Sequence, residues 1–386
     1  MGLKVIGIDR EDSPVIEHKK ILNEGDYLKR AIRLARRGMG HVSPNPMVGC
    51  VIVNNDAIVG EGYHRYFGGP HAEVEALQAA GEAAAGATLY VNLEPCCHYG
   101  KTPPCTDAII RAGIKRVVVG MIDPNPLVNQ RGIEILRQHG IEVTSGVEEE
   151  ACRELNRCFI KYIVAGLPYV TMKIAQSLDG RIATATGHSQ WITSYPARVL
   201  AHRLRAEHDA VIVGIGTVLA DDPQLTVRFV KGTNPWRIVL DDQLRIPLSS
   251  RLLTGELAAR TIVATTSQDE MRKKAVEATG AQVWTISPNQ SNRVSIPELL
   301  KKMASAHISS ALIEGGSQVN TAFLKAGMVD RIIIAIAPKI IGAGIEAIGD
   351  LGIERVDRCI ELTNIRLKAV GPDYVVTADL LYPNPQ

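Results

Sequence analysis

The chain has 386 residues, more than one hydrophobic core comfortably organises, so two domains are expected. Its 43 lysine and arginine residues nearly balance 41 aspartate and glutamate residues, which leaves a net charge of +2. This balance argues against a surface dedicated to nucleic acid or to anionic membranes. No apolar stretch approaches the roughly 20 residues that a membrane span needs. We therefore expect neither nucleic acid nor a membrane as a partner.

Residues 1–23 are expected to form a polar extension outside the fold. They contain acidic residues and only a short apolar run, so they do not resemble a secretory signal. Seven cysteines, three of them close to one motif, favour metal-binding thiols in a reducing compartment over a disulfide framework. The expected location is the cytoplasm.

The segment 24–167 alternates helical and strand patterns. A sheet covered by helices on both faces follows from that order. The expected elements are a helix at 27–37, a strand at 48–53 turning at 54–56 into a hairpin at 57–60, a helix starting at His71, a strand at 87–93, a helix at 106–112, a strand at 116–120, a helix at 131–139 and a strand at 141–144.

The pattern His71-Ala72-Glu73, followed by Pro95-Cys96 and then Cys105, predicts a zinc site. One imidazole and two thiolates are three good zinc ligands, and they leave a fourth position open for water, as catalytic sites do. Glu73 is not needed as a ligand, so it is free to move protons beside that water. This arrangement is typical of zinc-dependent nucleobase deaminases. The alternative is a set of core cysteines and a surface histidine.

His71 and Glu73 can face one metal only if they straddle a helix start, because mid-helix residues two apart point in nearly opposite directions. Gly68-Gly69-Pro70 supplies such a start. Pro95 likewise predicts that Cys96 opens a helix or turn, where free backbone N–H groups favour the thiolate.

Residues 148–164 are predicted to form a connecting helix, and Gly166-Leu167-Pro168 marks a seam. The segment 168–386 again alternates, and Ser177-Leu178-Asp179-Gly180 is predicted to be a hairpin turn. The expected strands lie at 169–175, 210–214, 237–241, 261–265, 282–286, 311–314 and 331–337, with a helix at 319–326.

Gly315-Gly316-Ser317 lies at a strand-to-helix turn, where free N–H groups and the helix dipole attract phosphate. Many such turns are glycine-rich for steric reasons alone, so both interpretations stay open. Gly214-Ile215-Gly216 also follows a strand, but the third glycine of the dinucleotide-binding fingerprint is missing. The residues therefore do not support a Rossmann fingerprint.

With these motifs, the chain resembles the bifunctional deaminase–reductase family of riboflavin biosynthesis. In the first half the resemblance rests on Ser43-Pro44-Asn45-Pro46, Pro70-His71-Ala72-Glu73, Leu93-Glu94-Pro95-Cys96 and the run from His98 to Cys105. In the second half it rests on Ser177–Gly180, Ser189-Gln190-Trp191-Ile192-Thr193, the run from Thr217 to Pro223 and Glu314-Gly315-Gly316. Eight residues between Cys96 and Cys105 distinguish this pattern from most cytidine and tRNA-adenosine deaminases.

The resemblance implies an α/β fold class: a cytidine-deaminase-like zinc domain at 24–167 and a dihydrofolate-reductase-like domain at 168–386. It implies one zinc ion per chain, held by His71, Cys96 and Cys105, with Glu73 catalytic, and NADPH in the second domain. The substrate contacts that it implies are Asn45, His64, His98, Lys101, Ser189, Arg205, Leu225, Arg228 and Glu314. The cofactor contacts are Ala175, Trp191, Thr217, Asp221, Asp242, Gly316, Ser317, Gln318, Val319, Asn320, Thr321 and Ala322.

The activity that the resemblance implies is hydrolytic deamination of 2,5-diamino-6-ribosylamino-4(3H)-pyrimidinone 5′-phosphate. NADPH-dependent reduction of the ribosyl group then gives 5-amino-6-(5-phosphoribitylamino)uracil. We expect these small phosphoribosylaminopyrimidines as ligands and a homo-oligomeric assembly. Arg205 and Arg228 are candidates for the substrate 5′-phosphate, and Lys173 is a weak candidate for the proton donor of the reduction.

Two positions depart from the family pattern. Cys97 stands where a serine is common and adds a spare thiol beside the zinc ligands. Asp242 stands where a small hydroxyl residue is usual, and a carboxylate there would repel a 2′-phosphate. Two rival functions are a nucleoside or tRNA deaminase, which leaves the second half unexplained, and a binding module in which zinc only stabilises the fold.

Overall fold

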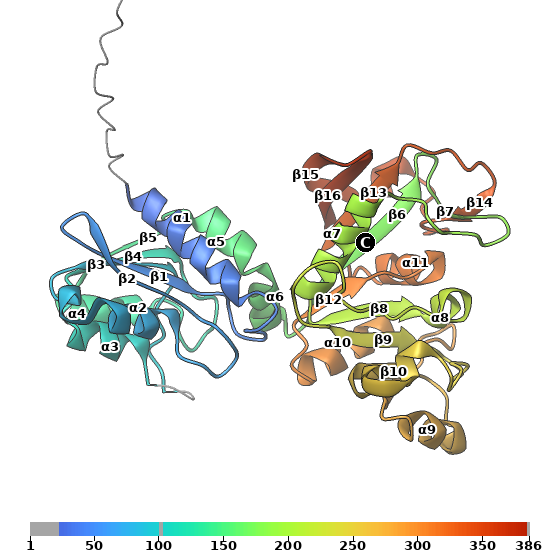
Figure 1. Cartoon of the computed structure of the whole chain (residues 1–386), viewed down its shortest axis with the longest axis horizontal. Helices are drawn as coiled ribbons and strands as arrows, with labels where there is room; N and C mark the ends of the chain where they lie inside the picture. The colour runs from blue at the N-terminus through green and yellow to red at the C-terminus, as the bar shows by residue number, and fades with distance from the viewer. Residues whose placement is uncertain (1–22, 100–102, 384–386) are drawn as a thin grey trace, which may run out of the picture.

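The computed structural model describes residues 23–99 and 103–383. They form two lobes, each built on its own large sheet, and helix α6 (Arg157–Ala165) lies at the junction between them (Figure 1). Gly166 ends this helix with φ at +65°, a left-handed conformation that suits glycine. The next strand begins at Tyr169, so the chain passes from one lobe to the other within four residues.

The N-terminal lobe contains a five-stranded sheet in the order β2-β1-β3-β4-β5. The hairpin partners β1 and β2 are antiparallel, as are β1 and β3, whereas β3, β4 and β5 run parallel. The elements are α1 (Glu24–Ala35), β1 (Gly49–Asn54), β2 (Ala57–Tyr63), α2 (Ala72–Ala80), β3 (Thr88–Leu93), α3 (Cys105–Arg111), β4 (Arg116–Met121), α4 (Arg131–Gln138), β5 (Glu142–Ser145) and α5 (Glu149–Leu155).

Alternate residues of these buried strands point to opposite faces, and each face has its own core. Ile52 and Leu89 pack on one side with residues of α2, α3 and α4. Val51 and Tyr90 pack on the other side with α1, and α5 extends that layer through Leu155. The expected sheet with helices on both faces is confirmed.

The predicted continuous helix over 148–164 was wrong, because it is broken at Asn156 into α5 and α6. The Asn156 side chain accepts a hydrogen bond from the Met47 backbone N–H (2.8 Å) and donates one to the Met47 carbonyl (3.0 Å). This buried amide ties the break to the loop before β1, a long-range contact that helical periodicity does not reveal.

The C-terminal lobe has a nine-stranded sheet in the order β11-β10-β9-β8-β12-β6-β13-β16-β15. Neighbours from β11 to β13 are parallel, and the last two strands are antiparallel. The elements are β6 (Tyr169–Ser177), β7 (Arg181–Thr184), α7 (Tyr195–Glu207), β8 (Ala210–Gly214), α8 (Ile215–Asp221), β9 (Trp236–Leu240), β10 (Thr261–Thr265), α9 (Glu270–Glu277), β11 (Gln282–Thr285), α10 (Ile296–Ser305), β12 (Ser310–Ile313), α11 (Ser317–Lys325), β13 (Arg331–Ala337), β14 (Gly344–Glu346), β15 (Glu361–Val370) and β16 (Asp373–Leu381).

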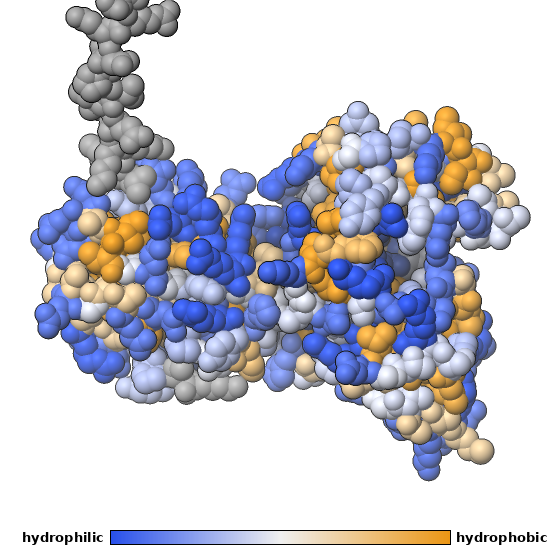
Figure 2. Space-filling view, viewed as in Figure 1, coloured by the Kyte–Doolittle hydropathy of each residue, from blue (hydrophilic) through white to orange (hydrophobic). Residues whose placement is uncertain are grey.

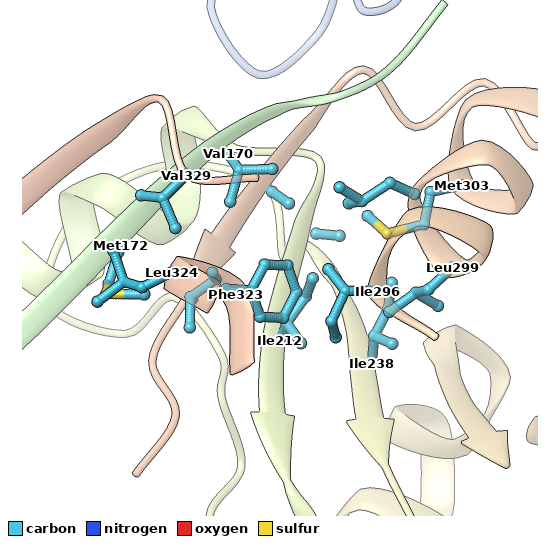
Figure 3. Close-up of a cluster of buried hydrophobic side chains, with 14 of the residues drawn as sticks. Val170, Met172, Ile212, Ile238, Ile296, Leu299, Met303, Phe323, Leu324 and Val329 are labelled. Atoms are coloured by element: carbon cyan, nitrogen blue, oxygen red, sulfur yellow. The ribbon is translucent and has the colours of Figure 1, made fainter. Parts of the chain in front are cut away.

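Helices cover both faces of this sheet too. Figure 3 shows the larger core, where Phe323 of α11 and Leu299 of α10 meet Ile212 and Ile238 of the central strands. On the opposite face, α7 covers the side of the sheet that bears Ile333. The carboxyl ends of the strands β6, β8, β9 and β12 lead into the loops that carry the sequence motifs of the second half.

The hairpin predicted at Ser177–Gly180 was wrong. The turn leads into β7, but β7 pairs with β14 in a separate two-stranded sheet instead of with β6. Asp179 fixes this turn by accepting hydrogen bonds from the backbone N–H groups of Ile341 (3.1 Å) and Gly342 (2.6 Å). The C-terminal hairpin of β15 and β16 was not predicted either.

Within the described residues, no helix has the length and apolar character required to cross a bilayer. Figure 2 shows hydrophilic side chains over most of the visible surface of both lobes, with small separate apolar patches between them.

Candidate active sites

His71, Cys96 and Cys105 converge in the N-terminal lobe. Their donor atoms lie within 4.8 Å of one another. His71 Nδ1 is 3.2 Å from Cys105 Sγ and 3.4 Å from Cys96 Sγ. Tetrahedral zinc, with nitrogen at about 2.0 Å and sulfur at about 2.3 Å, holds such a pair about 3.5 Å apart. The donor set and its spacing therefore fit a zinc ion.

Helix α2 presents His71 and Glu73 to this cluster from its first turn. His71 is the N-cap residue with extended φ and ψ, and Glu73 follows in the first turn, as predicted. The helix can approach β2 closely because Gly62 has no side chain, since a Cβ there would overlap the Ala72 carbonyl. This close packing fixes the distance between the start of α2 and the sheet.

The predicted helix or turn at Cys96 was wrong, because Cys96 lies in an irregular segment and Cys105 opens α3 instead. The start of α3 still donates a hydrogen bond to the sulfur of Cys96. The backbone N–H of Cys105 donates to Cys96 Sγ (3.3 Å), and that of Thr106 donates to the Cys96 carbonyl (3.2 Å). The free N–H groups that favour a thiolate thus come from across the loop.

The electrostatics match this arrangement. The Cys105 thiol, the His71 ring and the N–H of Cys105 hydrogen-bond to Cys96 and hold the pKa of its thiol well below the usual range. Glu73 is buried (3% exposed), and burial raises the pKa of its carboxyl to about 7. A carboxyl that titrates near neutrality can both accept and return a proton.

Sequence reasoning missed the function of Glu94. Its buried carboxylate accepts four backbone hydrogen bonds from the segment before and at the start of α4, donated by Asp123 (3.2 Å), Gln130 (3.0 Å), Gly132 (3.0 Å) and Ile133 (3.3 Å). Two residues before Cys96, this carboxylate anchors the ligand-bearing loop to the rest of the lobe. The acidic residue before Pro95 was the available signal.

Of the predicted substrate contacts of this lobe, His64 lies beside the metal ligand His71, with ring centroids 5.6 Å apart. Asn45 Nδ2 is 3.2 Å from Nε2 of His64, whose Nδ1 is 2.9 Å from the Pro70 carbonyl. This network assigns Nδ1 of His64 as the donor. Nδ1 of His98 is buried and has no hydrogen-bond partner among the residues that the structure describes. Lys101 lies outside the described residues.

Cys97 does not join the metal cluster. Its sulfur points to the Leu127 carbonyl at 3.9 Å, and burial raises the pKa of its thiol. Of the cysteines in the described ranges, the cluster of possible ligands contains Cys96 and Cys105. Cys97 therefore lies outside the group of side chains that could hold a metal ion.

A cavity of about 1600 Å³ opens in the C-terminal lobe. It exceeds the roughly 300–1,000 Å³ of a pocket for one small ligand, so its volume leaves room for a dinucleotide and a second molecule. The predicted residues that line it are Ala175, Ser189, Trp191, Arg205, Thr217, Asp221, Leu225, Arg228, Asp242, Glu314, Gly316, Ser317, Gln318, Val319, Asn320 and Ala322.

The glycine-rich turn between β12 and α11 faces this cavity. Gly316 is the N-cap residue of α11, and a Cβ added to it would meet nothing within 4 Å. Gly315, Gly316 and Ser317 line the cavity, so the start of this nine-residue helix borders it, which fits a cofactor diphosphate. Thr321 does not line the cavity, because its hydroxyl donates to the Ser317 carbonyl (2.7 Å) and accepts from the Gly349 N–H (2.8 Å).

Arg205 is engaged by Glu314 through two parallel hydrogen bonds, of which Nη2 to Oε2 measures 3.1 Å. Lys173 Nζ lies 3.7 Å from the same carboxylate. Burial would raise the pKa of Glu314, but the charges of Arg205 and Lys173 outweigh it and bring the pKa to about 2. Because Glu314 neutralises Arg205, the expectation that Arg205 binds a phosphate is not supported by this geometry.

Arg228 differs from Arg205 in that its side-chain acceptors are neutral. Its Nη1 donates to Gln224 Oε1 (2.8 Å) and Thr226 Oγ1 (2.9 Å), and its backbone N–H donates to His202 Nδ1 (2.9 Å). Burial, with the charges of Arg205 and Arg251, lowers the pKa of Arg228. An anion beside this guanidinium would be stabilised.

Asp242 lines the cavity at the end of β9, and its Oδ1 accepts a hydrogen bond from the Val294 N–H (2.8 Å). Three arginines, Arg245, Arg251 and Arg293, line the same cavity. The carboxylate that stands where a hydroxyl residue is usual is therefore held by the backbone of the loop after β11.

Both lobes match known families. Residues 23–121 match the cytidine and deoxycytidylate deaminase zinc-binding region, and residues 168–376 match the RibD C-terminal domain. The riboflavin biosynthesis protein RibD of Aquifex aeolicus is 50% identical over 352 residues, which cover 91% of this chain and 97% of that protein. The RibD protein of Escherichia coli is 41% identical over 361 residues, or 90% and 96% of the two chains.

Solved structures agree over most of the chain. Acinetobacter baumannii RibD superposes with a TM-score of 0.83 at 39% identity, covering 93% of this chain and 99% of that one. A Thermotoga maritima diaminohydroxyphosphoribosylaminopyrimidine deaminase/5-amino-6-(5-phosphoribosylamino)uracil reductase superposes with a TM-score of 0.80 at 38% identity and the same coverage. Similarity that spans both lobes at this level shows that the chain belongs to the riboflavin biosynthesis protein RibD family, the bifunctional deaminase–reductases.

Proposed function

We propose that the chain deaminates 2,5-diamino-6-ribosylamino-4(3H)-pyrimidinone 5′-phosphate in its N-terminal lobe and reduces the ribosyl group of the product in its C-terminal lobe. The observation that carries this proposal is the pairing of a His–Cys–Cys cluster beside a buried glutamate with a separate large cavity on one polypeptide. The domains would span 24–167 and 168–386; the extension predicted at 1–23 lies outside the described residues except for Asn23.

In the deaminase site, His71, Cys96 and Cys105 would hold zinc. Zinc supplies a Lewis acid that lowers the pKa of bound water from about 15.7 toward about 7. Glu73 would take a proton from the attacking water, protonate the adjacent ring nitrogen and later return a proton to the departing ammonia. The position of Glu73 in the first turn of α2 supports this role, as does the pKa near 7 of its carboxyl.

Asn45, His64 and His98 would contact the pyrimidine. The unpartnered Nδ1 of His98 supports this assignment, because a buried polar atom without a hydrogen bond destabilises the folded protein unless a ligand supplies that bond. His64, with its proton on Nδ1, hydrogen-bonds the amide of Asn45 and leaves the Asn45 carbonyl oxygen free to accept from an exocyclic amino group. Lys101, which lies outside the described residues, remains a candidate by resemblance.

In the reductase site, NADPH supplies a hydride to C1′ of the ribosyl group. Breaking the bond between C1′ and the ring oxygen requires a proton on that oxygen, and we assign Lys173 as its donor. Lys173 lines the cavity, and burial lowers the pKa of its ammonium, which eases proton release. The ionised carboxylate of Glu314 would hold Lys173 in place.

The other cavity residues would divide between the two ligands. Gly316, Ser317 and the following turn would bind the cofactor diphosphate, and Arg228 the substrate 5′-phosphate. We also infer that the enzyme is a cytoplasmic homo-oligomer with small-molecule ligands only; the seven cysteines, all of them free thiols, are compatible with a reducing compartment.

The decisive experiment incubates the zinc-loaded protein with the diaminopyrimidine phosphate, with and without NADPH. Ammonia should appear in both reactions, and NADPH oxidation only where deamination has occurred. Glu73→Gln should block ammonia release yet still reduce the deaminated compound, and Lys173→Met should do the reverse. Cytidine and tRNA serve as competing substrates. A zinc-stabilised binding module would release no ammonia, and a nucleoside or tRNA deaminase would prefer those competitors.

A further inference from the structure

The loop that carries Asn45 in the N-terminal lobe is held by residues of the C-terminal lobe. The hydroxyl of Ser43 donates a hydrogen bond to Oδ2 of Asp209 at 2.7 Å. The hydroxyl of Thr233 donates to the Gly40 carbonyl at 3.1 Å. Asp209 lies between α7 and β8, and Thr233 precedes β9, so both acceptor and donor belong to the lobe that carries the reductase cavity.

Asp209 is a rigid acceptor, because its surroundings fix it on several sides. The same Oδ2 accepts hydrogen bonds from the backbone N–H groups of Ser309 (2.8 Å) and Ser310 (3.0 Å), and the Ser309 hydroxyl lies 2.9 Å away. The backbone N–H of Asp209 donates to the Ser310 hydroxyl at 2.9 Å. Both serines are 4% exposed and stand at the start of β12, beside β8 in the centre of the sheet.

Polar contacts lead from Ser43 to the metal ligands. Two residues after Ser43, the amide of Asn45 meets His64 at 3.2 Å, and His64 meets the Pro70 carbonyl at 2.9 Å. Pro70 immediately precedes His71. The later end of the loop is fixed independently, because Met47 is bonded by Asn92 and Asn156. Between these two ends, the loop is bonded to the second lobe by Asp209 and Thr233, and the Ser309 hydroxyl also lies 2.9 Å from the Ser43 hydroxyl.

We propose that Asp209 is a positioning residue for deamination, which holds the substrate-binding loop of one active site from the domain of the other. This inference rests on the proposed contact of Asn45 and His64 with the pyrimidine. Without the bond to Asp209, the Ser43 end of the loop gains conformations in which Asn45 leaves His64, and substrate must then select the ordered one. Substrate affinity falls, whereas Glu73 and the zinc ligands stay in place.

Other contacts between the lobes provide a matched control. Lys161 of α6 pairs with Asp330, and Glu154 of α5 with Arg331 (2.7 and 3.0 Å), so these pairs join the lobes without touching the Asn45 loop. Lys161→Met removes one charged partner of such a pair at the same interface. It should leave the KM for the pyrimidine unchanged within about twofold, since the loop keeps its own supports.

The test measures ammonia release against pyrimidine concentration for Ser43→Ala, Asp209→Ala, Asp209→Asn and Lys161→Met in the zinc-loaded full chain. Loss of one hydrogen bond to a carboxylate corresponds to about a tenfold rise in KM. We expect that rise for Ser43→Ala and Asp209→Ala, with kcat within about twofold and zinc content unchanged. Asp209→Asn should restore most of the affinity, because an amide oxygen can still accept from Ser43 and the two backbone N–H groups.

Reduction of the deaminated substrate should be unchanged in Ser43→Ala, which separates loop positioning from general damage. In a double variant of Ser43 and Asp209, KM should rise by less than the product of the two single rises, because both substitutions remove the bond between Ser43 and Asp209. If Asp209→Ala fails to fold, Ser43→Ala decides alone. An unchanged KM in Ser43→Ala while Asn45→Ala raises it would overturn the positioning role. An unchanged KM in Asn45→Ala would instead reject the proposed substrate contact.

Discussion

Replacement of Arg228 by alanine should weaken recognition of the substrate 5′-phosphate. The guanidinium has five N–H donors, and the two on Nη1 are used by Gln224 and Thr226. The remaining three can make a bidentate contact with a phosphate dianion. A charge-assisted bond contributes about 1.5–3 kcal/mol. Because solvent reaches the side chain, we count one such bond and not two, which corresponds to about a ten- to hundredfold loss of kcat/KM.

The assay compares NADPH oxidation with the deaminated substrate and with its dephosphorylated form, for the parent enzyme and for Arg228→Ala. The parent should lose about ten- to hundredfold when the phosphate is removed, and the variant only a few fold. Arg228→Lys should fall between them, since an ammonium cannot bond in a bidentate manner. Arg245→Ala removes another arginine of the cavity and controls for the general positive potential. Equal losses in the parent and Arg228→Ala would show that another group binds the phosphate.

Four further outcomes are expected. Glu73→Gln should keep one zinc per chain by metal analysis while losing about 10²–10⁴-fold in deamination; activity within tenfold of the parent would refute the mechanism. Cys97→Ser should be nearly silent in zinc content and ammonia release, and loss of metal would mean that the ligand assignment is wrong. A fragment beginning at Pro168 should fold and bind NADPH, as measured by fluorescence titration, because its core is complete within one lobe; a folded fragment that binds neither nicotinamide cofactor would contradict the assignment. Asp242→Ser should sharpen the preference for NADPH over NADH in kcat/KM, since it removes a negative charge near the expected 2′-phosphate, and an unchanged ratio would place Asp242 away from that group.

Most elements of the two large sheets, the hairpin of β15 and β16 excepted, could be predicted from sequence because they are locally encoded. Buried strands such as β3 and β4 contain short apolar runs, Leu89-Tyr90-Val91 and Val117-Val118-Val119, and helices such as α4 carry an apolar stripe. The sequence also determined the metal cluster, since His71, Cys96 and Cys105 supply the nitrogen and sulfur donors that zinc prefers. Their convergence within 4.8 Å agrees with that interpretation.

Tertiary contacts decided the rest. The break at Asn156 depends on Met47, more than a hundred residues away, and β7 finds its partner in β14, so neither local periodicity nor turn chemistry could reveal them. Arg205 and Arg228 look alike in the sequence. Only the fold brings Glu314 to Arg205 and leaves Arg228 with neutral acceptors, and the charge that surrounds a guanidinium determines whether it can bind an anion.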